Sequence, residues 1–293
     1  MALATAAFPP DSPLERILLK AAQAGFQAAE LAIGETGPVT WTTAREECVC
    51  LARHAVRAGV AISALVVTDA ASTNLAAPNP AARRSARDRL AAALERAAWL
   101  GAGVVAFSPA AVGGAGSAEP AVRYEDAYSL TLEALLELRF EAERQAVRLA
   151  PLACRNRFLL SPLETRDLID RINSPWVGAG LDVGDLLPLG SPADWIVSLG
   201  HRLAHVRIGA SAHGQNAEWR IENVESSAGT SADSHGVPVG ASVSTFSILH
   251  SQLVMKALRQ ARYDGALTLL ADDLPVALRL AAMLRQAEQP AGA

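Results

Sequence analysis

Two charged residues near the ends of apolar runs could do chemistry together. Asp182 lies near the end of Val177–Val183, and Arg207 lies near the end of Leu203–Ile208. If these runs are neighbouring strands, the carboxylate and the guanidinium can pair at one edge of the sheet. A guanidinium there suits a phosphate or carboxylate ligand, because its fork binds such groups through two hydrogen bonds. A structural salt bridge is the alternative interpretation of this catalytic candidate pair.

Other polar side chains are expected at the same edge, and with Asp182 and Arg207 they complete the candidate substrate-binding set: Glu30, Arg155, Asn156 and Asp185. They could bind the hydroxyl groups of a small ligand, or they could be ordinary polar strand ends. A carboxylate of Glu30, Asp182 or Asp185 could also act as a general base. Arg207 would then stabilise negative charge that develops on a substrate.

The sequence offers no clear cofactor motif, so no cofactor is predicted. His213 and His235 lie in a long polar segment and His205 lies within an apolar run. Two loop histidines without a third ligand are more often solvated than zinc-bound. The glycine-rich run Val112–Ser117 lacks the third glycine of a dinucleotide loop and reads as a flexible loop.

A repeated pattern must position these residues. An Ala- and Leu-rich amphipathic stretch is followed by a Gly, a short apolar run and then polar residues. Helix followed by buried strand, many times over, is typical of a parallel sheet covered by helices. The predicted strands are Phe26–Ile33, Val60–Val67, Gly103–Phe107, Val147–Cys154, Val177–Val183, Leu203–Ile208 and Ala266–Leu270. Ala2–Phe8 would supply an eighth, although its alanines give it poor β-propensity.

Helix starts agree with this register. Ser12–Glu15 and Ser161–Glu164 each place Ser at the N-cap, Pro at the first helical position and Glu three residues after the cap, which is a capping box. Ser191–Asp194 is a weaker case with Asp in place of Glu. Residues 13–24 read as a helix, and Arg83–Leu100 carries apolar residues at helical spacing.

These elements predict an α/β fold, a single-domain (β/α)8 TIM barrel over residues 1–293 with its core at about 13–285. Long polar loops follow three strands, at Thr68–Ala82, Ser108–Val122 and Ser211–Thr245. In a barrel they all lie at the C-terminal face, where active sites are built. The segment 211–245 is expected to be either a lid over the site or a mobile insert without function.

Composition narrows the classes of partner that the protein is expected to bind. A net charge of -4 and 5% aromatic residues argue against nucleic acid, which draws on clustered Lys and Arg and on stacking rings. The three cysteines, Cys48, Cys50 and Cys154, read as reduced thiols. The first ten residues lack a signal-peptide pattern, and no apolar run approaches the ~18 residues of a membrane span. The expectation is therefore a cytoplasmic protein with no membrane partner, and its oligomeric state is left open.

Several segments, taken together, resemble the sugar phosphate isomerase/epimerase family, the xylose isomerase-like barrels. They occur in the order of that family's motifs and span residues 13 to 275, nearly the whole chain. The most specific is Asn156–Pro162, which is similar to an Asn-x-Phe-Leu-Leu-Ser-Pro after the family's fifth strand. The others are Gly25–Leu31, Ala97–Ala102, Leu181–Gly184, His205–Arg207 and Tyr263–Gly265.

The resemblance implies a divalent metal held by Glu, Asp, His and Glu at strand ends, with the two glutamates moving a proton. At the matching positions this chain has Leu152, Asp182, Arg207 and Leu270, so three of four ligands are replaced. Leu has no lone pair for a cation, and Arg brings a permanent positive charge. A family-type metal centre is not expected, although a shift of two or three residues would bring Asp272 or Asp273 to the last position.

Three functions follow from this reading. The first is a diverged isomerase/epimerase-like protein that lacks the metal-dependent activity and binds a small sugar phosphate, carboxylate or polyol derivative. The anionic preference rests on Arg207, which would need an acceptor-rich partner if nothing else neutralised it. The second is an active isomerase that needs no metal. The third is a non-catalytic scaffold in which side chains fill the old pocket. Fold alone does not choose among them, so whether the chain is an enzyme stays open.

Overall fold

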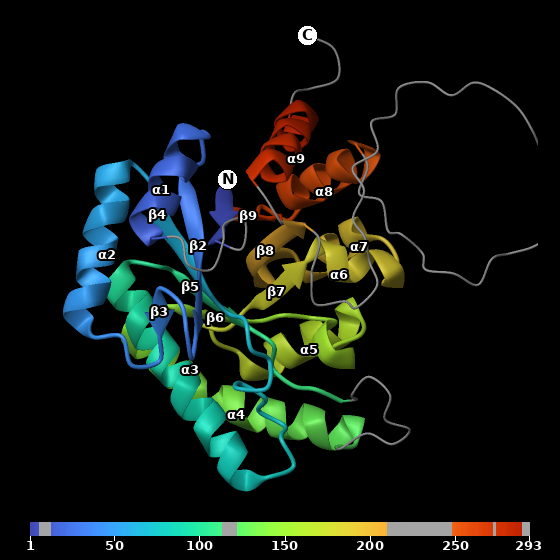
Figure 1. The fold of residues 1–293 in the computed structure, drawn as a ribbon. Helices are drawn as coiled ribbons and strands as arrows, with labels where there is room; N and C mark the ends of the chain where they lie inside the picture. Colours follow the sequence, from blue (N-terminus) through green and yellow to red (C-terminus); the bar gives the residue numbers. More distant parts are fainter. Residues whose placement is uncertain (6–12, 113–121, 210–247, 272–273, 289–293) are drawn as a thin grey trace, which may run out of the picture.

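In the computed structural model, eight parallel strands form a nearly closed barrel with helices around it (Figure 1). The structure describes residues 1–5, 13–112, 122–209, 248–271 and 274–288. The barrel strands are β1 (Ala2–Ala4), β2 (Ala28–Gly34), β4 (Ala61–Val67), β5 (Val104–Phe107), β6 (Arg148–Pro151), β7 (Ala179–Asp182), β8 (Leu203–Gly209) and β9 (Leu267–Leu270). A two-residue strand, β3 (Val39–Thr40), pairs with β2 outside the barrel. The predicted single-domain TIM barrel is confirmed as the fold class.

Strand order shows how the barrel closes. The ladder runs β6-β5-β4-β2-β1-β9-β8-β7, so β1 lies between β2 and β9 and completes the ring. Residues 2–4 of the doubtful run Ala2–Phe8 therefore do form a strand, and residues 6–8 lie outside the described part. The last seam, between β6 and β7, is joined by two isolated bridges, Leu149 to Val177 and Leu152 to Gly180.

Glycine is needed at this seam. A Cβ added to Gly180 would lie 3.0 Å from the Ala150 carbonyl oxygen and 3.0 Å from Leu152 Cδ2. Such contacts are tighter than ordinary packing, so a side chain here would push β7 away from β6. The seam therefore places Leu152 directly against the strand that carries Asp182.

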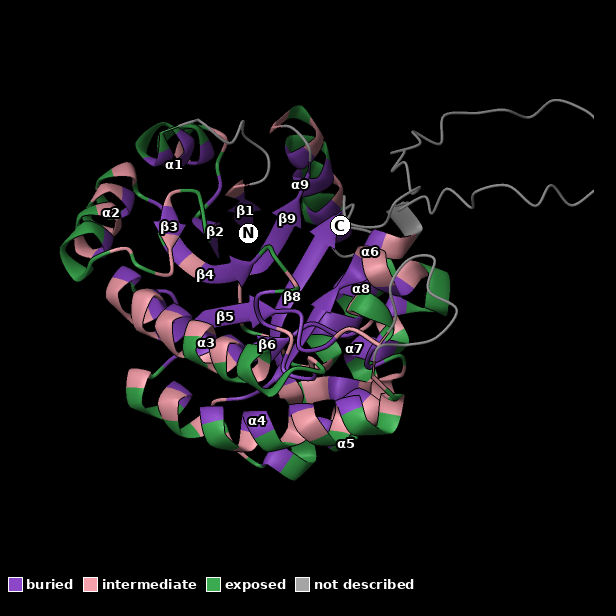
Figure 2. Cartoon of the chain, turned by 60° about the horizontal axis from the view of Figure 1, so that its bottom comes forward, coloured by how far each residue is buried: buried purple, intermediate pink, exposed green. Residues whose placement is uncertain are grey.

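The helices that cover the barrel follow the predicted order. They are α1 (Leu14–Gln23), α2 (Arg45–Ala58), α3 (Pro80–Leu100), α4 (Tyr124–Gln145), α5 (Pro162–Ile172), α6 (Val183–Leu186), α7 (Pro192–Leu199), α8 (Ile248–Gln260) and α9 (Leu274–Glu288). Figure 2 shows buried strands inside and helices whose exposed faces turn outward. In the described ranges, no helix is long and apolar enough to span a membrane.

Three helices begin after a residue suited to capping, and in two of them a capping hydrogen bond forms. Ser161 Oγ accepts a hydrogen bond from the Glu164 backbone at 3.1 Å, which confirms the predicted cap of α5. Asn79 Oδ1 accepts from the Ala81 backbone at 2.8 Å, so α3 begins at Pro80, ahead of the predicted Arg83. The third case is a correction, because Ser191 is the N-cap of α7 but its side chain makes no capping hydrogen bond.

The start of α1 also differs from the prediction. Pro13 is the N-cap, so the helix begins one residue later than expected. Ser12 lies outside the described residues, as do the lid-like segment 211–245 with its two histidines, Asp272 and Asp273, and most of the glycine-rich run.

Alternation along the strands separates two layers of core. One buried cluster faces the barrel interior and consists of Ala64, Val66, Val104, Ala106, Ala150, Leu152 and Ala204. The residues between them, such as Leu65, Val105 and Leu149, belong to the larger cluster that includes the helices. Because successive side chains of a strand point to opposite faces, this pattern fixes which residues face inward.

Candidate functional site

Six ionisable side chains, two of them arginines, three of them acids and one a histidine, meet toward the C-terminal ends of the strands. This charged cluster consists of Glu30, Arg155, Asp182, Asp185, His205 and Arg207. It includes five of the six residues predicted for the site. The sixth, Asn156, is exposed and donates its side-chain amide to Ser108 Oγ at 2.8 Å, so it lies outside the cluster.

Asp182 is the centre of the charged cluster. Its Oδ2 lies 3.0 Å from Arg155 Nη2 and 3.5 Å from Arg207 Nη1, and its Oδ1 accepts from the Gly184 backbone at 3.2 Å. Asp182 and Arg207 are register partners on β7 and β8. The predicted pair therefore forms, but the closer cation is Arg155, which comes from the short 3₁₀ helix after β6 (Arg155–Arg157).

Glu30 anchors the other side of the charged cluster. Its Oε2 lies 2.7 Å from His205 Nε2, and its Oε1 lies 3.1 Å from Arg207 Nη2. Burial acts to raise the pKa of Glu30, but the Arg207 charge and the His205 hydrogen bond outweigh it and hold the pKa below its usual value. Glu30 is therefore an ionised carboxylate in the barrel interior.

His205 is the site residue that sequence reasoning missed. The pairing of β7 with β8 shifts between Leu203 and His205, a bulge at Ala204 that turns His205 inward. The available signal was its spacing from Arg207, since residues two apart on a strand share a face. That signal would have placed the imidazole beside the guanidinium.

Arg207 is not the uncompensated cation on which the predicted anionic preference rested. It pairs with Glu30 and with Asp182, and only 5% of its side chain is exposed. The three carboxylates of the charged cluster outnumber its two guanidinium groups. An added anion would therefore enter a cluster that already holds more carboxylates than guanidinium groups.

Arg155 and Asp185 form the edge of the charged cluster nearest to solvent. Their side chains are 14% and 19% exposed, against 0 to 5% for the other four, and Arg155 Nε lies 3.0 Å from Asp185 Oδ2. Burial, followed by the neighbouring Asp182 charge, raises the pKa of Asp185 to about 6, although Arg155 opposes the shift. A carboxyl that changes protonation near neutral pH is suited to acid/base work.

The positions that the sequence resemblance matched to the family's metal ligands all face the barrel interior. Leu152 is 1% exposed in the interior cluster and Leu270 is 9% exposed, next to Gly209 of β8. Arg207 lies at the third position. Over the described ranges, no three His, Cys, Asp or Glu side chains are grouped so that they could hold a metal ion. The residues present thus do not fit a divalent cation at this point.

Three polar atoms in or beside the charged cluster are buried without a hydrogen-bond partner, although Glu30 Oε1 is in an ion pair with Arg207. The other two are Arg207 Nε and Thr268 Oγ1, and their residues are register partners on β8 and β9. Buried polar groups in proteins are nearly always satisfied. This end of the barrel therefore has spare hydrogen-bonding capacity.

Comparison with known proteins agrees with this architecture. The model of the xylose isomerase-like TIM barrel family matches residues 18–286. Among solved structures, L-ribulose 3-epimerase is similar with a TM-score of 0.72 at 16% identity, over 98% of this chain and 95% of that one. D-psicose 3-epimerase in the presence of D-fructose gives 0.70 at 15% identity, over 98% and 96%.

A further similar structure is 3-keto-D-glucoside 4-epimerase from E. coli, with a TM-score of 0.68 at 14% identity over 97% of this chain and 98% of that one. Identities this low establish the fold alone. A search of curated proteins finds no significant match. Because the family model covers most of the sequence, the chain belongs to the xylose isomerase-like TIM barrel family.

Proposed function

We propose that this chain binds a small sugar or polyol derivative at the C-terminal end of its barrel, without the divalent metal and without the metal-dependent isomerase or epimerase activity that the family resemblance implies. One observation carries the proposal. Two guanidinium groups, from Arg155 and Arg207, lie on Asp182 where the family would place a cation. The two fixed positive charges lie against the remaining carboxylate, and Leu152 and Leu270 offer no lone pair, so a metal would lack the family's donor set and would meet two cations there.

The electrostatics favour a neutral, hydroxyl-rich ligand over the anionic one predicted from the sequence. Both guanidinium groups already have carboxylate partners, whereas Arg207 Nε and Thr268 Oγ1 have none among the described residues. A sugar hydroxyl donates and accepts hydrogen bonds without adding charge. The similar solved structures are sugar epimerases by name, which supports the ligand class.

A thermal-shift panel tests this. D-fructose, D-tagatose and D-allulose, each compared with a phosphorylated counterpart, would be added to the chelator-treated protein. We expect a neutral sugar to raise the melting temperature, and Arg155→Gln to remove the effect. The matched control is Arg202→Gln, because Arg202 pairs with Asp170 on the surface. Stabilisation only by phosphorylated sugars would restore the anionic proposal, and stabilisation by none would favour the scaffold.

A metal-independent isomerase is the second candidate, and Asp185 is the observation that favours it. Its raised pKa, about 6, and its partial exposure suit a base that takes a proton from a bound sugar, with Arg155 stabilising the resulting negative charge. Exchange of carbon-bound protons in D₂O, measured by NMR with chelator present, would reveal it. Exchange that Asp185→Asn abolishes would establish this function in place of simple binding.

A further inference from the structure

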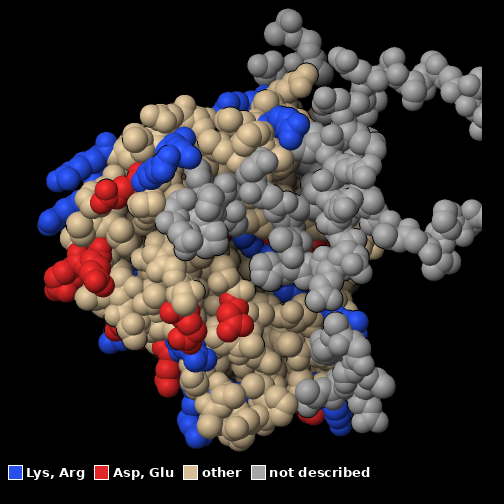
Figure 3. Space-filling view, viewed as in Figure 1, with Lys and Arg blue, Asp and Glu red and all other residues tan. Residues whose placement is uncertain are grey.

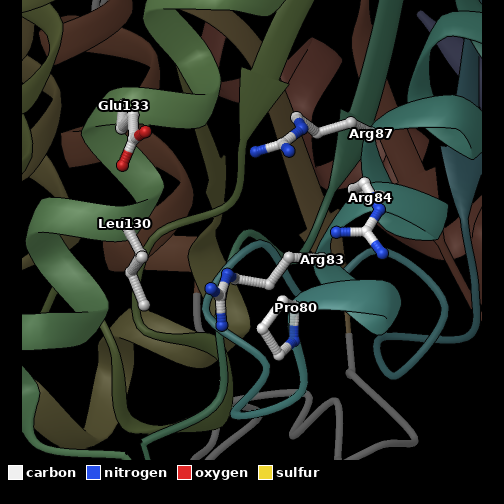
Figure 4. A pocket seen from close by; sticks show the side chains of 6 residues that line it. All are labelled: Pro80, Arg83, Arg84, Arg87, Leu130 and Glu133. Carbon is white, nitrogen blue, oxygen red and sulfur yellow. The ribbon is translucent and has the colours of Figure 1, made fainter.

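A polar pocket lies between α3 and α4, away from the charged cluster. Its volume is about 150 Å³, and it is lined by Pro80, Arg83, Arg84, Arg87, Leu130 and Glu133. Figure 4 shows Arg83 and Arg87 extending from α3 toward α4, where Leu130 and Glu133 lie. None of these residues belongs to the barrel-mouth site, so the pocket needs its own explanation.

The pocket has an excess of positive charge. Three guanidinium groups face one carboxylate, Glu133, so the lining carries a formal charge of two. In the described structure, Arg84 and Glu133 form no hydrogen bond or ion pair. Arg87 has only a long contact, 3.5 Å from its Nε to Glu137 Oε2. Most of this charge is therefore not neutralised by the protein's own acids.

The arginines also lie at positions where their charges lower the stability of α3. Arg83 and Arg87 are four residues apart, a spacing at which like charges repel on a helix surface. The first turn of α3 has no acidic residue to offset the positive end of its dipole. Figure 3 shows the face seen in Figure 1, on which both blue and red side chains occur.

Arg83 is held ready for a ligand. Its Nη1 donates to the Ala77 carbonyl at 2.8 Å and to the Pro78 carbonyl at 3.2 Å. These bonds fix the guanidinium while its other nitrogens make no further contact that the structure records. A pre-positioned guanidinium loses little conformational entropy when it binds an oxyanion.

We propose that this pocket is a binding site for a compact dianion, a phosphate group that is free or is part of a small phosphorylated molecule. Arg83 and Arg87 contact the anion from α3, and Arg84 adds positive charge at the rim of the pocket. The carboxylate of Glu133 repels negative charge, so it limits how much negative charge a ligand can carry. The site is independent of the function proposed for the barrel mouth.

The test is an isothermal calorimetric titration of the full-length protein with inorganic phosphate at constant ionic strength. Glycerol phosphate would be used in parallel, to separate recognition of free phosphate from that of a phosphate monoester. We expect saturable binding that Arg84→Gln/Arg87→Gln weakens by about tenfold or more, since charge-assisted bonds to phosphate are lost. Glu133→Gln should tighten binding several-fold by removing a repulsive charge.

The control is Arg53→Gln/Arg57→Gln on α2, which removes two exposed arginines and the same total charge. Because Arg84 has no partner among the described residues, Arg84→Gln alone provides a variant whose folding is not at risk. The proposal is overturned if phosphate does not bind saturably, if the α3 variants bind it normally, or if the α2 control weakens binding equally.

Discussion

Asp182 is shared between two guanidinium groups, and this makes each member of the charged cluster depend on the others. Arg155 and Arg207 both approach the same oxygen, Asp182 Oδ2, while Arg207 also reaches Glu30. Buried charges are costly unless they are paired, and removing one partner leaves the other uncompensated. Substitutions here should therefore change stability as well as ligand binding, and the two effects must be measured separately.

Arg207→Leu should destabilise the fold strongly. It leaves Glu30 with only the His205 hydrogen bond and Asp182 with only Arg155 as a charged partner. We expect a loss of about 3–5 kcal/mol in the free energy of unfolding, measured by urea denaturation. Arg202→Gln, which breaks an exposed pair, should cost about 1 kcal/mol or less. Adding Glu30→Gln to Arg207→Leu should recover part of the loss. If Arg207→Leu and Arg202→Gln cost the same free energy of unfolding, the shared network would be contradicted.

Asp185 should make stability fall as pH rises between about 4 and 6. Its pKa in the folded state is about 6, above the ordinary value of 3.8. In this window the native state keeps a proton that the unfolded chain has released, so raising the pH favours unfolding. The wild type should lose up to about 3 kcal/mol relative to Asp185→Asn across the window. Parallel pH profiles for the two proteins would exclude the shifted pKa.

The sequence predicted which residues form the site better than it predicted which of them pair with one another. Asp182 and Arg207 were predicted as a pair because they end neighbouring strands. What could not be read from the sequence is that Arg155 approaches Asp182 more closely than Arg207 does. Arg155 lies in a segment after β6 in which four non-glycine residues, Cys154, Asn156, Arg157 and Leu159, have a left-handed backbone. Non-glycine residues rarely adopt this conformation, so residue type and spacing did not predict the path of the chain here.

At the scale of elements, the sequence predicted best the features that depend on residues close together in the chain. The Ser161 cap forms as predicted and each of the eight barrel strands overlaps its predicted run, since a capping side chain acts over three residues and strand burial over a short apolar run. β6 was predicted to continue to Cys154 but ends at Pro151. Leu152 forms only an isolated bridge to Gly180, and the end of a ladder depends on a partner strand that is distant in sequence.

The two Ser-Pro helix starts provide a matched prediction. Ser161 Oγ accepts from the Glu164 backbone, whereas the side chain of Ser191 makes no cap bond. Ser161→Ala should therefore cost about 0.5–2 kcal/mol and Ser191→Ala only a few tenths, measured by thermal or urea denaturation. Equal costs at the two positions would mean that the Ser161 hydrogen bond contributes nothing to stability.

At the scale of the whole molecule, the barrel provides positions and the side chains decide the chemistry. Leu152, Asp182, Arg207 and Leu270 face inward on or directly after four strands of the barrel. If these are the positions of the family's metal ligands, as the sequence resemblance implies, our proposal requires that the donors changed while the fold was kept. Such a change is compatible with the fold, because barrel stability depends on interior packing and not on ligand chemistry.

This reasoning predicts that manganese or zinc will not stabilise the wild-type protein. A ligand that binds only the native state raises its stability with concentration, and by about 4 kcal/mol at a thousand times its dissociation constant. Thermal denaturation of chelator-treated protein with millimolar manganese should therefore show no upward shift, because two leucines cannot ligate and Arg207 repels the ion. The variant Leu152→Glu/Arg207→His/Leu270→Glu restores the donor types on the same frame, and its melting temperature should rise when manganese is added. A rise in the wild type that Asp182→Ala abolishes would show that the barrel holds a metal with donors other than these four.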